Sequence, residues 1–359
     1  MQNETQILIL ALLLILANIT NTTDTFFDLD NFSIKLYYEL ASSKPQNNQV
    51  LSTLSIASFL VLLRQSAETT TAYEINENLG FLSQAAEYIQ SKLAVFEKTM
   101  DNSLFMYNAN NISMQAANLQ IEELILNQKD LLKAVFDINI CQKCEKLAFE
   151  HHEIRLEFSS AFQFKGNFRH QFSGVESKPF YVSENKKIDL DMLILAAKIR
   201  FADIPELEAY AFEIPLYDRL NFLVILISKM KGGIRDLENH LHKFPYKKLQ
   251  SYMKPHWIKL YFPKVDFFVE TSLRDELENL GLGSMFKKLC EVSAHIRVSN
   301  FCYNASFSFD EKNAGVILEE DTEACDFNGY EQYIIDHPFI FMVTSETNFI
   351  HIIGKFSSK

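Results

Sequence analysis

The pattern of hydrophobic and polar positions predicts helices early in the chain. Residues 28–42 place Phe32, Leu36 and Leu40 on one helical face, and residues 55–63 are apolar on every side, which is typical of a buried helix. A shorter helix is predicted over 71–79, ending before Gly80, and an amphipathic one over 84–98.

Strand patterns dominate later. Over residues 154–164, Ile154, Leu156 and Phe158 point one way while Arg155 and Glu157 point the other, which predicts a strand with one face in the core. Residues 220–227, LNFLVILI, are apolar at most positions and predict a strand buried on both faces. Helices followed by strands predict an α+β protein with large antiparallel or mixed sheets.

Composition narrows the class of protein. The chain has 359 residues, 48% of them hydrophobic, with no linker, charge block or internal repeat, so we expect one soluble, monomeric domain. A net charge of −12 argues against nucleic-acid binding, which depends on neutralising phosphates. No glycine-rich phosphate loop occurs among the ten glycines.

The amino terminus predicts export. Residues 7–17, ILILALLLILA, form an apolar run of signal-peptide length that is too short to span a bilayer, so we expect a secretion signal over 1–20. A short buried helix is the alternative. Asn-X-Ser/Thr triplets agree with a secreted, extracellular glycoprotein, and the candidate glycosylation sites are Asn31, Asn111 and Asn304.

The cysteines and catalytic motifs give little sign of chemistry. Five cysteines are an odd number, which leaves at least one thiol free or intermolecular in an oxidising compartment. Cys141 and Cys144 fit a redox pair, half of a zinc site with His151 and His152, or a local disulfide or plain surface thiols. The last is favoured because a lone CxxC is a weak signal. No HExxH or GxSxG motif is present, so we expect no enzyme activity, metal or cofactor.

Five segments stand in order along the chain, over residues 51–81, 162–172, 211–227, 265–286 and 335–356, and together they resemble the serpin family. LSTLSIASFLVLLRQSAETTTAYEINENLGF (51–81) is similar to the family's LSPLSI segment, FQFKGNFRHQF (162–172) to its FKGxWxxxF strand, and IDHPFIFMVTSETNFIHIIGKF (335–356) to its DHPF strands. AFEIPLYDRLNFLVILI (211–227) and VDFFVETSLRDELENLGLGSMF (265–286) match two more. The resemblance covers 26–359 and implies a single domain with three β-sheets and helices behind a central sheet of about five strands.

The resemblance also implies an exposed reactive-centre loop at about 311–333. In serpins a protease cleaves this loop, whose first arm then inserts into the central sheet as a new strand and distorts the protease. Counting from either end of the loop places the bait bond at Phe327-Asn328 or at Ala324-Cys325. A bait Phe suits chymotrypsin-like or cathepsin-like proteases.

This chain departs from the family at the inserting hinge. The family's hinge glycine is Asn313, and small alanines are replaced by Val316, Ile317 and Leu318, which are bulky for a segment that slides between strands. In the family's inserted register, Glu320 faces the core, where an unpaired carboxylate costs several kcal/mol. We therefore expect insertion to stall near Leu318. The hinge residues concerned are Glu311, Asn313, Ala314, Gly315, Val316, Leu318 and Glu320.

The positions at which the sheet opens have also changed. Ser52 and Ser55 match the serines of the family's shutter, but its Asn and His are Ser160 and Tyr303, and the Trp at the top of the sheet is Phe168. The helix usually written Ile-Asn-x-Trp-Val is not found between Phe105 and Leu156. These departures predict weak or lost protease inhibition and a binding role on the serpin scaffold. The alternative is a working suicide inhibitor of a chymotrypsin-like serine protease or a cathepsin-like cysteine protease.

Two kinds of partner follow. An extracellular protease or another protein ligand is implied by the resemblance. Residues 242–264, which hold six lysines and the only Trp, fit a weak polyanion site, and two strand edges with solvated lysines would give the same pattern.

Overall fold

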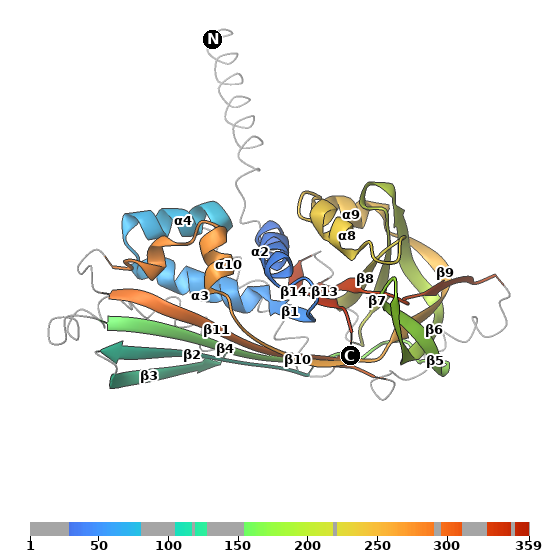
Figure 1. Cartoon of the computed structure of the whole chain (residues 1–359), viewed down its shortest axis with the longest axis horizontal. Coiled ribbons are helices and arrows are strands. Elements are labelled where there is room, and N and C mark those ends of the chain that lie inside the picture. Colours follow the sequence, from blue (N-terminus) through green and yellow to red (C-terminus); the bar gives the residue numbers. More distant parts are fainter. Residues whose placement is uncertain are drawn as a thin grey trace, which may run out of the picture.

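A five-stranded mixed sheet runs along one side of the computed structural model, which describes residues 29–79, 105–116, 119–127, 154–217, 221–290, 296–310, 329–345 and 349–358 (Figure 1). Its strand order is β10-β11-β4-β2-β3. Neighbouring strands are antiparallel except β4 and β11, which are parallel. The strands are β2 (Phe105–Ala116), β3 (Leu119–Asn127), β4 (Ile154–Lys165), β10 (Val265–Ser272) and β11 (Ile296–Phe309).

The remaining strands form one hydrogen-bonded network of nine strands in the order β1-β14-β13-β8-β7-β6-β9-β12, with β5 also on β6. The two smaller sheets that the resemblance implies are continuous because β6 is 19 residues long and pairs with β5, β7 and β9. The strands are β1 (Gln49–Ser52), β5 (Gly174–Ser183), β6 (Lys186–Ile204), β7 (Ala209–Pro215), β8 (Asn221–Ser228), β9 (Lys254–Pro263), β12 (Glu331–Ile334), β13 (Phe339–Ser345) and β14 (Ile350–Phe356).

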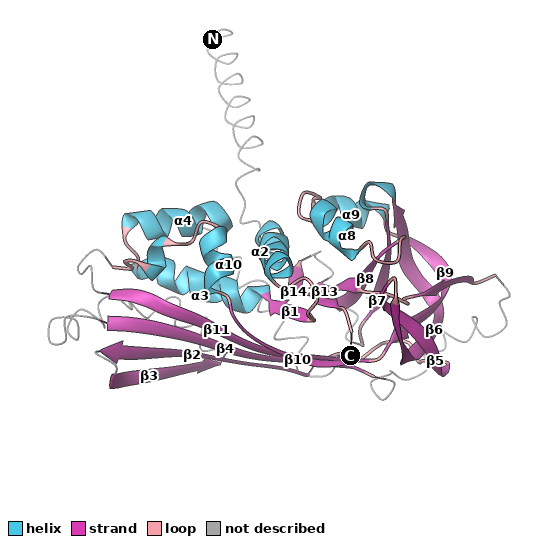
Figure 2. Ribbon diagram, viewed as in Figure 1, coloured by secondary structure: helices cyan, strands magenta, loops and turns pink. Residues whose placement is uncertain are grey.

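Helices pack on one face of the central sheet and beside the second network (Figure 2). Helix α3 is buried on every side up to Leu63, and its Phe59 contacts rings of both β4 and β11. The helices are α2 (Leu29–Ser43), α3 (Thr53–Ser66), α4 (Thr69–Leu79), α8 (Ile234–Leu241), α9 (Tyr246–Tyr252) and α10 (Arg274–Asn279), with 3-10 turns η2 (Pro205–Leu207) and η3 (Ser284–Phe286). None of the described helices is long and apolar enough to cross a membrane.

The hydrophobic pattern predicts these elements well. The helices expected over 28–42, 55–63 and 71–79 are α2, α3 and α4, and the strand expected over 154–164 is β4, whose buried and partly exposed residues alternate. The strand expected over 220–227 is β8, where Phe222 is the one residue that is not buried. Leu60 and Phe158 are both 0% exposed, as predicted.

The basic stretch 242–264 is not two strand edges, and that alternative is wrong for its first half. Helix α9 occupies this part, because Tyr246 and Leu249 recur at helical spacing and Pro245 suits a helix start. Only β9 in the second half is a strand.

Several predictions lie outside the described residues. These are the signal segment 1–20, the helix over 84–98, the region 128–153 with Cys141 and Cys144, and residues 311–328 of the loop. Strands β2 and β3, which precede residues 128–153, are antiparallel neighbours, and Ala116 at the end of β2 is paired with Leu119 at the start of β3. The chain therefore passes from β2 to β3 through residues 117–118.

Candidate functional site

The central seam of the five-stranded sheet lies between β4 and β11. Every residue of β4 has a partner on β11, with one register shift between Val298 and Asn300. Paired parallel strands leave no strand between them, so a new strand can enter only if these hydrogen bonds break and the two strands move apart by about 4.8 Å.

Aromatic rings lie across this seam on its inner face. Phe158 of β4 stacks on Phe301 of β11 at 6.0 Å between ring centroids, and Phe164 stacks on Phe307 at 4.8 Å. Phe59 of α3 meets the Phe158 and Phe301 rings edge-on at 5.0 and 5.5 Å. Because each such pair contributes about 0.5–1.5 kcal/mol beyond its buried area, the rings hold β4, β11 and α3 together.

The predicted shutter residues are brought together beneath the middle of the seam. Tyr303 and Ser160 are register partners across it, and both are fully buried. The Ser52 backbone N–H donates to the Tyr303 hydroxyl at 2.6 Å, and Ser55 is buried one helical turn later. Burial raises the pKa of Tyr303 well above its ordinary value, so the hydroxyl stays protonated.

The hydrogen bond found among the shutter residues does not cross the seam between β4 and β11. The Tyr303 hydrogen bond joins β11 to the start of α3, not to β4. The Ser160 hydroxyl is buried with no hydrogen-bond partner among the described residues. No described side-chain hydrogen bond at this level crosses from Ser160 to Tyr303, and the seam is held there by its backbone ladder and by the neighbouring rings.

Phe168, at the top of the sheet, is 0% exposed and belongs to an aromatic cluster. Its ring contacts Phe172 at 5.1 Å, Phe309 at 5.6 Å and Phe262 at 6.0 Å. These rings come from the segment after β4, from the end of β11 and from β9. Phe168 thus ties the upper end of the seam to the second sheet, although it carries no polar atom.

The remaining predicted site residues are placed as follows. Asn31 is exposed in the first turn of α2, Asn304 is partly exposed on the outer face of β11, and the backbone of Asn111 lies in β2. The reactive-bond candidates Ala324, Cys325, Phe327 and Asn328 and the hinge residues from Glu311 to Glu320 lie outside the described residues.

Two cysteines are described, and they differ. Cys290 is disulfide-bonded, whereas Cys302 is free and partly buried on the outer face of β11. Burial and the carboxylate of Glu157, 3.4 Å from the thiol, raise the pKa of Cys302, which makes it a poor nucleophile. No cluster of three or more possible metal-ligating side chains occurs in the described part of the chain.

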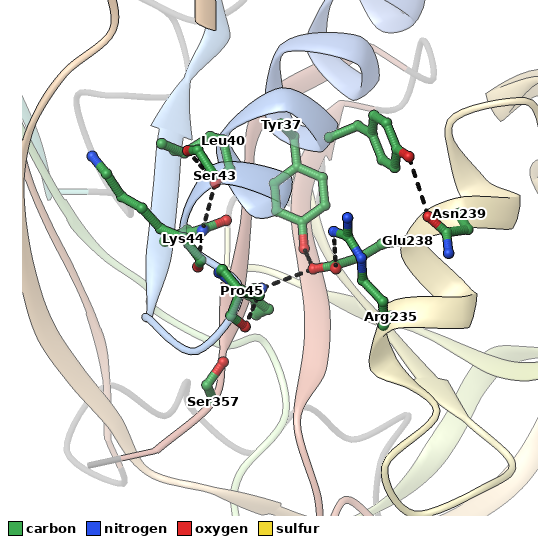
Figure 3. A network of polar contacts seen from close by, with 12 residues as sticks. Tyr37, Leu40, Ser43, Lys44, Pro45, Arg235, Glu238, Asn239 and Ser357 are labelled. Atoms are coloured by element: carbon green, nitrogen blue, oxygen red, sulfur yellow. Dashed lines mark hydrogen bonds and ion pairs between the residues drawn. The ribbon is translucent and has the colours of Figure 1, made fainter. Parts of the chain in front are cut away.

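A buried polar network, not found from the sequence, joins α2, α8 and β14 (Figure 3). Glu238 accepts hydrogen bonds from the Tyr37 hydroxyl at 3.0 Å and from Lys355 at 2.9 Å, and Arg235 lies 3.5 Å from its other oxygen. Lys355 also donates to the Pro45 carbonyl at 3.0 Å. Burial lowers the pKa of Lys355, and the Glu238 carboxylate opposes that effect.

Comparison with known proteins shows which family has this architecture. The family model described as serpin (serine protease inhibitor) matches residues 28–137 and 140–359, so the chain belongs to the serpin family. Serpins are generally protease inhibitors and not catalysts.

Individual relatives are distant. Serpin A12 of Mus musculus is 23% identical over 350 residues, covering 87% of this chain and 82% of its own. The solved structure of maspin has a TM-score of 0.71 at 18% identity, covering 92% of this chain and 98% of that one. Native protease nexin-1 with heparin has a TM-score of 0.68 at 18% identity, covering 92% and 97%. Identities this low make the chain a divergent member.

Proposed function

We propose that this serpin is a secreted protein in which protease inhibition is weak or lost and the scaffold serves binding. The observation that carries the proposal is the set of aromatic contacts across the seam between β4 and β11. Separating β4 from β11 pulls apart the Phe158–Phe301 and Phe164–Phe307 pairs, which Phe59 braces from behind. An inhibitor must open this seam quickly, before the protease completes hydrolysis and leaves.

The secreted location rests on the sequence. The apolar segment 7–17 and the sequons at Asn31, Asn111 and Asn304 support it, and Asn31 is exposed as an attached glycan requires. Mass spectrometry of the protein released by secreting cells tests both features, through the new amino terminus and the glycan masses. An intact residue 1 and unmodified sequons would refute this part of the proposal.

A protease panel separates lost inhibition from the alternative of a suicide inhibitor. The full chain is incubated with chymotrypsin-like, trypsin-like and cathepsin-like proteases, and the products are separated in SDS. We expect cleavage between residues 311 and 333 without an SDS-stable complex. A stable complex with any chymotrypsin-like or cathepsin-like protease would establish the alternative.

Weak polyanion binding is the second candidate role. Lys243 and Lys247 are exposed at the junction of α8 and α9, whereas Lys248 and Lys264 are engaged by Glu206 at 3.1 Å and Asp191 at 3.6 Å. The heparin complex of protease nexin-1 concerns that protein, but it shows that a serpin fold accommodates such a ligand.

Heparin affinity chromatography tests this role. We expect K243A/K247A to elute at lower salt than the unmodified chain, because exposed unpaired cations contribute most to polyanion binding. The matched control is K248A/K264A, which removes the same charge from ion-paired positions. Equal elution of both double variants, or no retention of the unmodified chain at low salt, would exclude a site at α9.

A further inference from the structure

Strands β6 and β9, side by side at one end of the molecule (Figure 1), carry lysines and an aromatic ring on their outward face. Lys198 is paired in register with Trp257, and Ala196 with Lys259, and register partners on neighbouring strands share a face of the sheet. The opposite face belongs to the core, because Ile258 is 0% exposed. We call Lys198, Trp257 and Lys259 the lysine face.

The two lysines of this face have no anionic partner in the described part of the chain. The Lys259 ammonium lies 5.5 Å from the centroid of the Tyr261 ring, and neither Lys259 nor Lys198 forms an ion pair with the described residues. A third lysine, Lys178, lies 4.5 Å from the same Tyr261 ring, but Glu176 pairs with it at 2.8 Å. Two uncompensated cations are thus left close together in a chain whose net charge is −12.

The lysine face adjoins the C-terminal end of the reactive-centre loop. The Tyr330 ring meets the Trp257 ring edge-on at 5.8 Å, and the Lys198 ammonium lies 5.9 Å from the centroid of that Trp257 ring. Gln332, two residues further on in β12, is the register partner of Lys259. The chain that arrives from the loop therefore enters the sheet beside these lysines.

The loop itself carries the opposite charge. Residues 319–326 hold five carboxylates and no lysine or arginine, and we call this segment the acidic run. Its last glutamate, Glu323, is seven positions before Tyr330, and seven residues span up to about 24 Å, so the acidic run is within reach of the lysine face. A segment tethered this closely has an effective concentration in the millimolar range, at which weak ion pairs are enough to hold it.

We propose that the acidic run docks on the lysine face of the same chain, where its carboxylates pair with Lys198 and Lys259. The charges are complementary, and the tether favours the chain's own carboxylates over those of an external partner. Docking holds the intact loop against β9 and keeps its reactive-bond candidates from proteases. Because salt screens exposed ion pairs, the docked fraction falls as ionic strength rises. The inference concerns the intact chain, so it does not depend on whether a cleaved loop inserts.

Trp257 reports on this face directly, because it is the only tryptophan of the chain and is partly exposed. The test is quenching of its fluorescence by acrylamide, a neutral quencher, in the intact full chain at low and at high NaCl concentration. We expect the quenching constant of the unmodified protein to rise about twofold at high salt, because the acidic run then leaves the ring. An equal constant at both salt concentrations would overturn the proposal.

Neutralising variants assign the salt response to its two partners. The acidic run is neutralised without a change of shape in E319Q/E320Q/D321N/E323Q/D326N, which should show the higher quenching constant at both salt concentrations. K198Q/K259Q should likewise lose the salt response. The matched control is K186Q/K187Q, which removes the same charge from exposed positions at the start of β6 and should keep the response.

A charge swap identifies the occupant of the face. K198E/K259E should lose the shielding of Trp257, and adding E319K/E320K/D321K/E323K to that variant should restore it. If the swap restores no shielding, the proposal is wrong. A salt response that survives neutralisation of the acidic run but disappears in K198Q/K259Q would assign the face to a second copy of the chain or to another acidic molecule, and would also overturn the proposal.

Discussion

At the scale of single residues, the Glu238 network shows what a buried charge requires. Lys355 is 0% and Glu238 2% exposed, so removing Lys355 leaves Glu238 buried with Arg235, 3.5 Å from its other oxygen, as its one remaining charged partner among the described residues, which costs up to about 3–5 kcal/mol. We expect K355M to lower the free energy of unfolding by close to this amount and Y37F by about 1.5–3 kcal/mol, because Y37F removes one donor from a buried carboxylate. The more exposed pair Arg274–Glu278 on α10 is the comparison, and R274A, which also removes the hydrogen bond to the Ser299 carbonyl at 2.9 Å and the contact with the Phe286 ring, should cost about 1–2 kcal/mol, less than K355M. Urea unfolding measures all three. Equal losses in K355M and R274A would show that Glu238 is solvated when its partner leaves.

The Tyr303 hydroxyl gives a second prediction at this scale. In Y303F the Ser52 N–H keeps its buried position but loses its acceptor, which costs about 1–3 kcal/mol. Urea unfolding should show this loss, and the Ser52 amide should exchange faster. Y73F, at a tyrosine that is 62% exposed, should leave stability unchanged. Unchanged stability in Y303F would mean that water or another group replaces the hydroxyl.

At the scale of elements, the sequence predicts what depends on periodicity and misses what depends on proximity. The alternation of β4 and the apolar run of β8 record burial directly, so these strands and their faces are predictable. The alternation of Phe301, Tyr303 and Phe307 in β11 would likewise have revealed the rings that face β4. By contrast, Tyr37 and Glu238 are 201 positions apart, and no local pattern indicates that they meet. The α9 helix is not predictable from the pattern because it is only seven residues long. Over so few residues, the hydrophobic spacing of a helix cannot be distinguished from that of a strand that carries lysines.

The packing of α3 against the seam between β4 and β11 gives a prediction at this scale. F59A removes the ring that contacts both Phe158 and Phe301, so it should lower the free energy of unfolding by about 3–5 kcal/mol and speed hydrogen exchange along β4 and β11. The control is F268A on β10, where the ring is 64% exposed and the change should stay within about 0.5 kcal/mol. Unchanged exchange along the seam in F59A would mean that the rings do not hold the strands together.

At the scale of the whole molecule, the shutter defines what an inserting strand would meet. If residues following the turn after Phe309 enter antiparallel to β11 with Ala314 opposite Phe309, Glu320 comes opposite Tyr303, because each lies six positions further from the turn. The described groups at that level are the Ser160 and Tyr303 hydroxyls and the Ser52 N–H, none of them a cation. Neutral hydroxyls repay only part of the several kcal/mol that a buried carboxylate costs.

Cleavage of the loop should therefore stabilise this molecule little. We expect the melting temperature to rise by only a few degrees on cleavage at neutral pH, because insertion stalls before Glu320 reaches the shutter. E320A should rise further on cleavage, whereas E319A, which removes the same charge from a side chain that would face outward, should behave like the unmodified chain. Acidification should narrow the difference between E320A and the unmodified protein, since a protonated carboxyl loses most of its burial cost. Calorimetry of the intact and the cleaved protein measures these melting temperatures. A large rise in melting temperature on cleavage of the unmodified chain at neutral pH would show that the sheet accepts Glu320. Suicide inhibition would then be the function of this serpin.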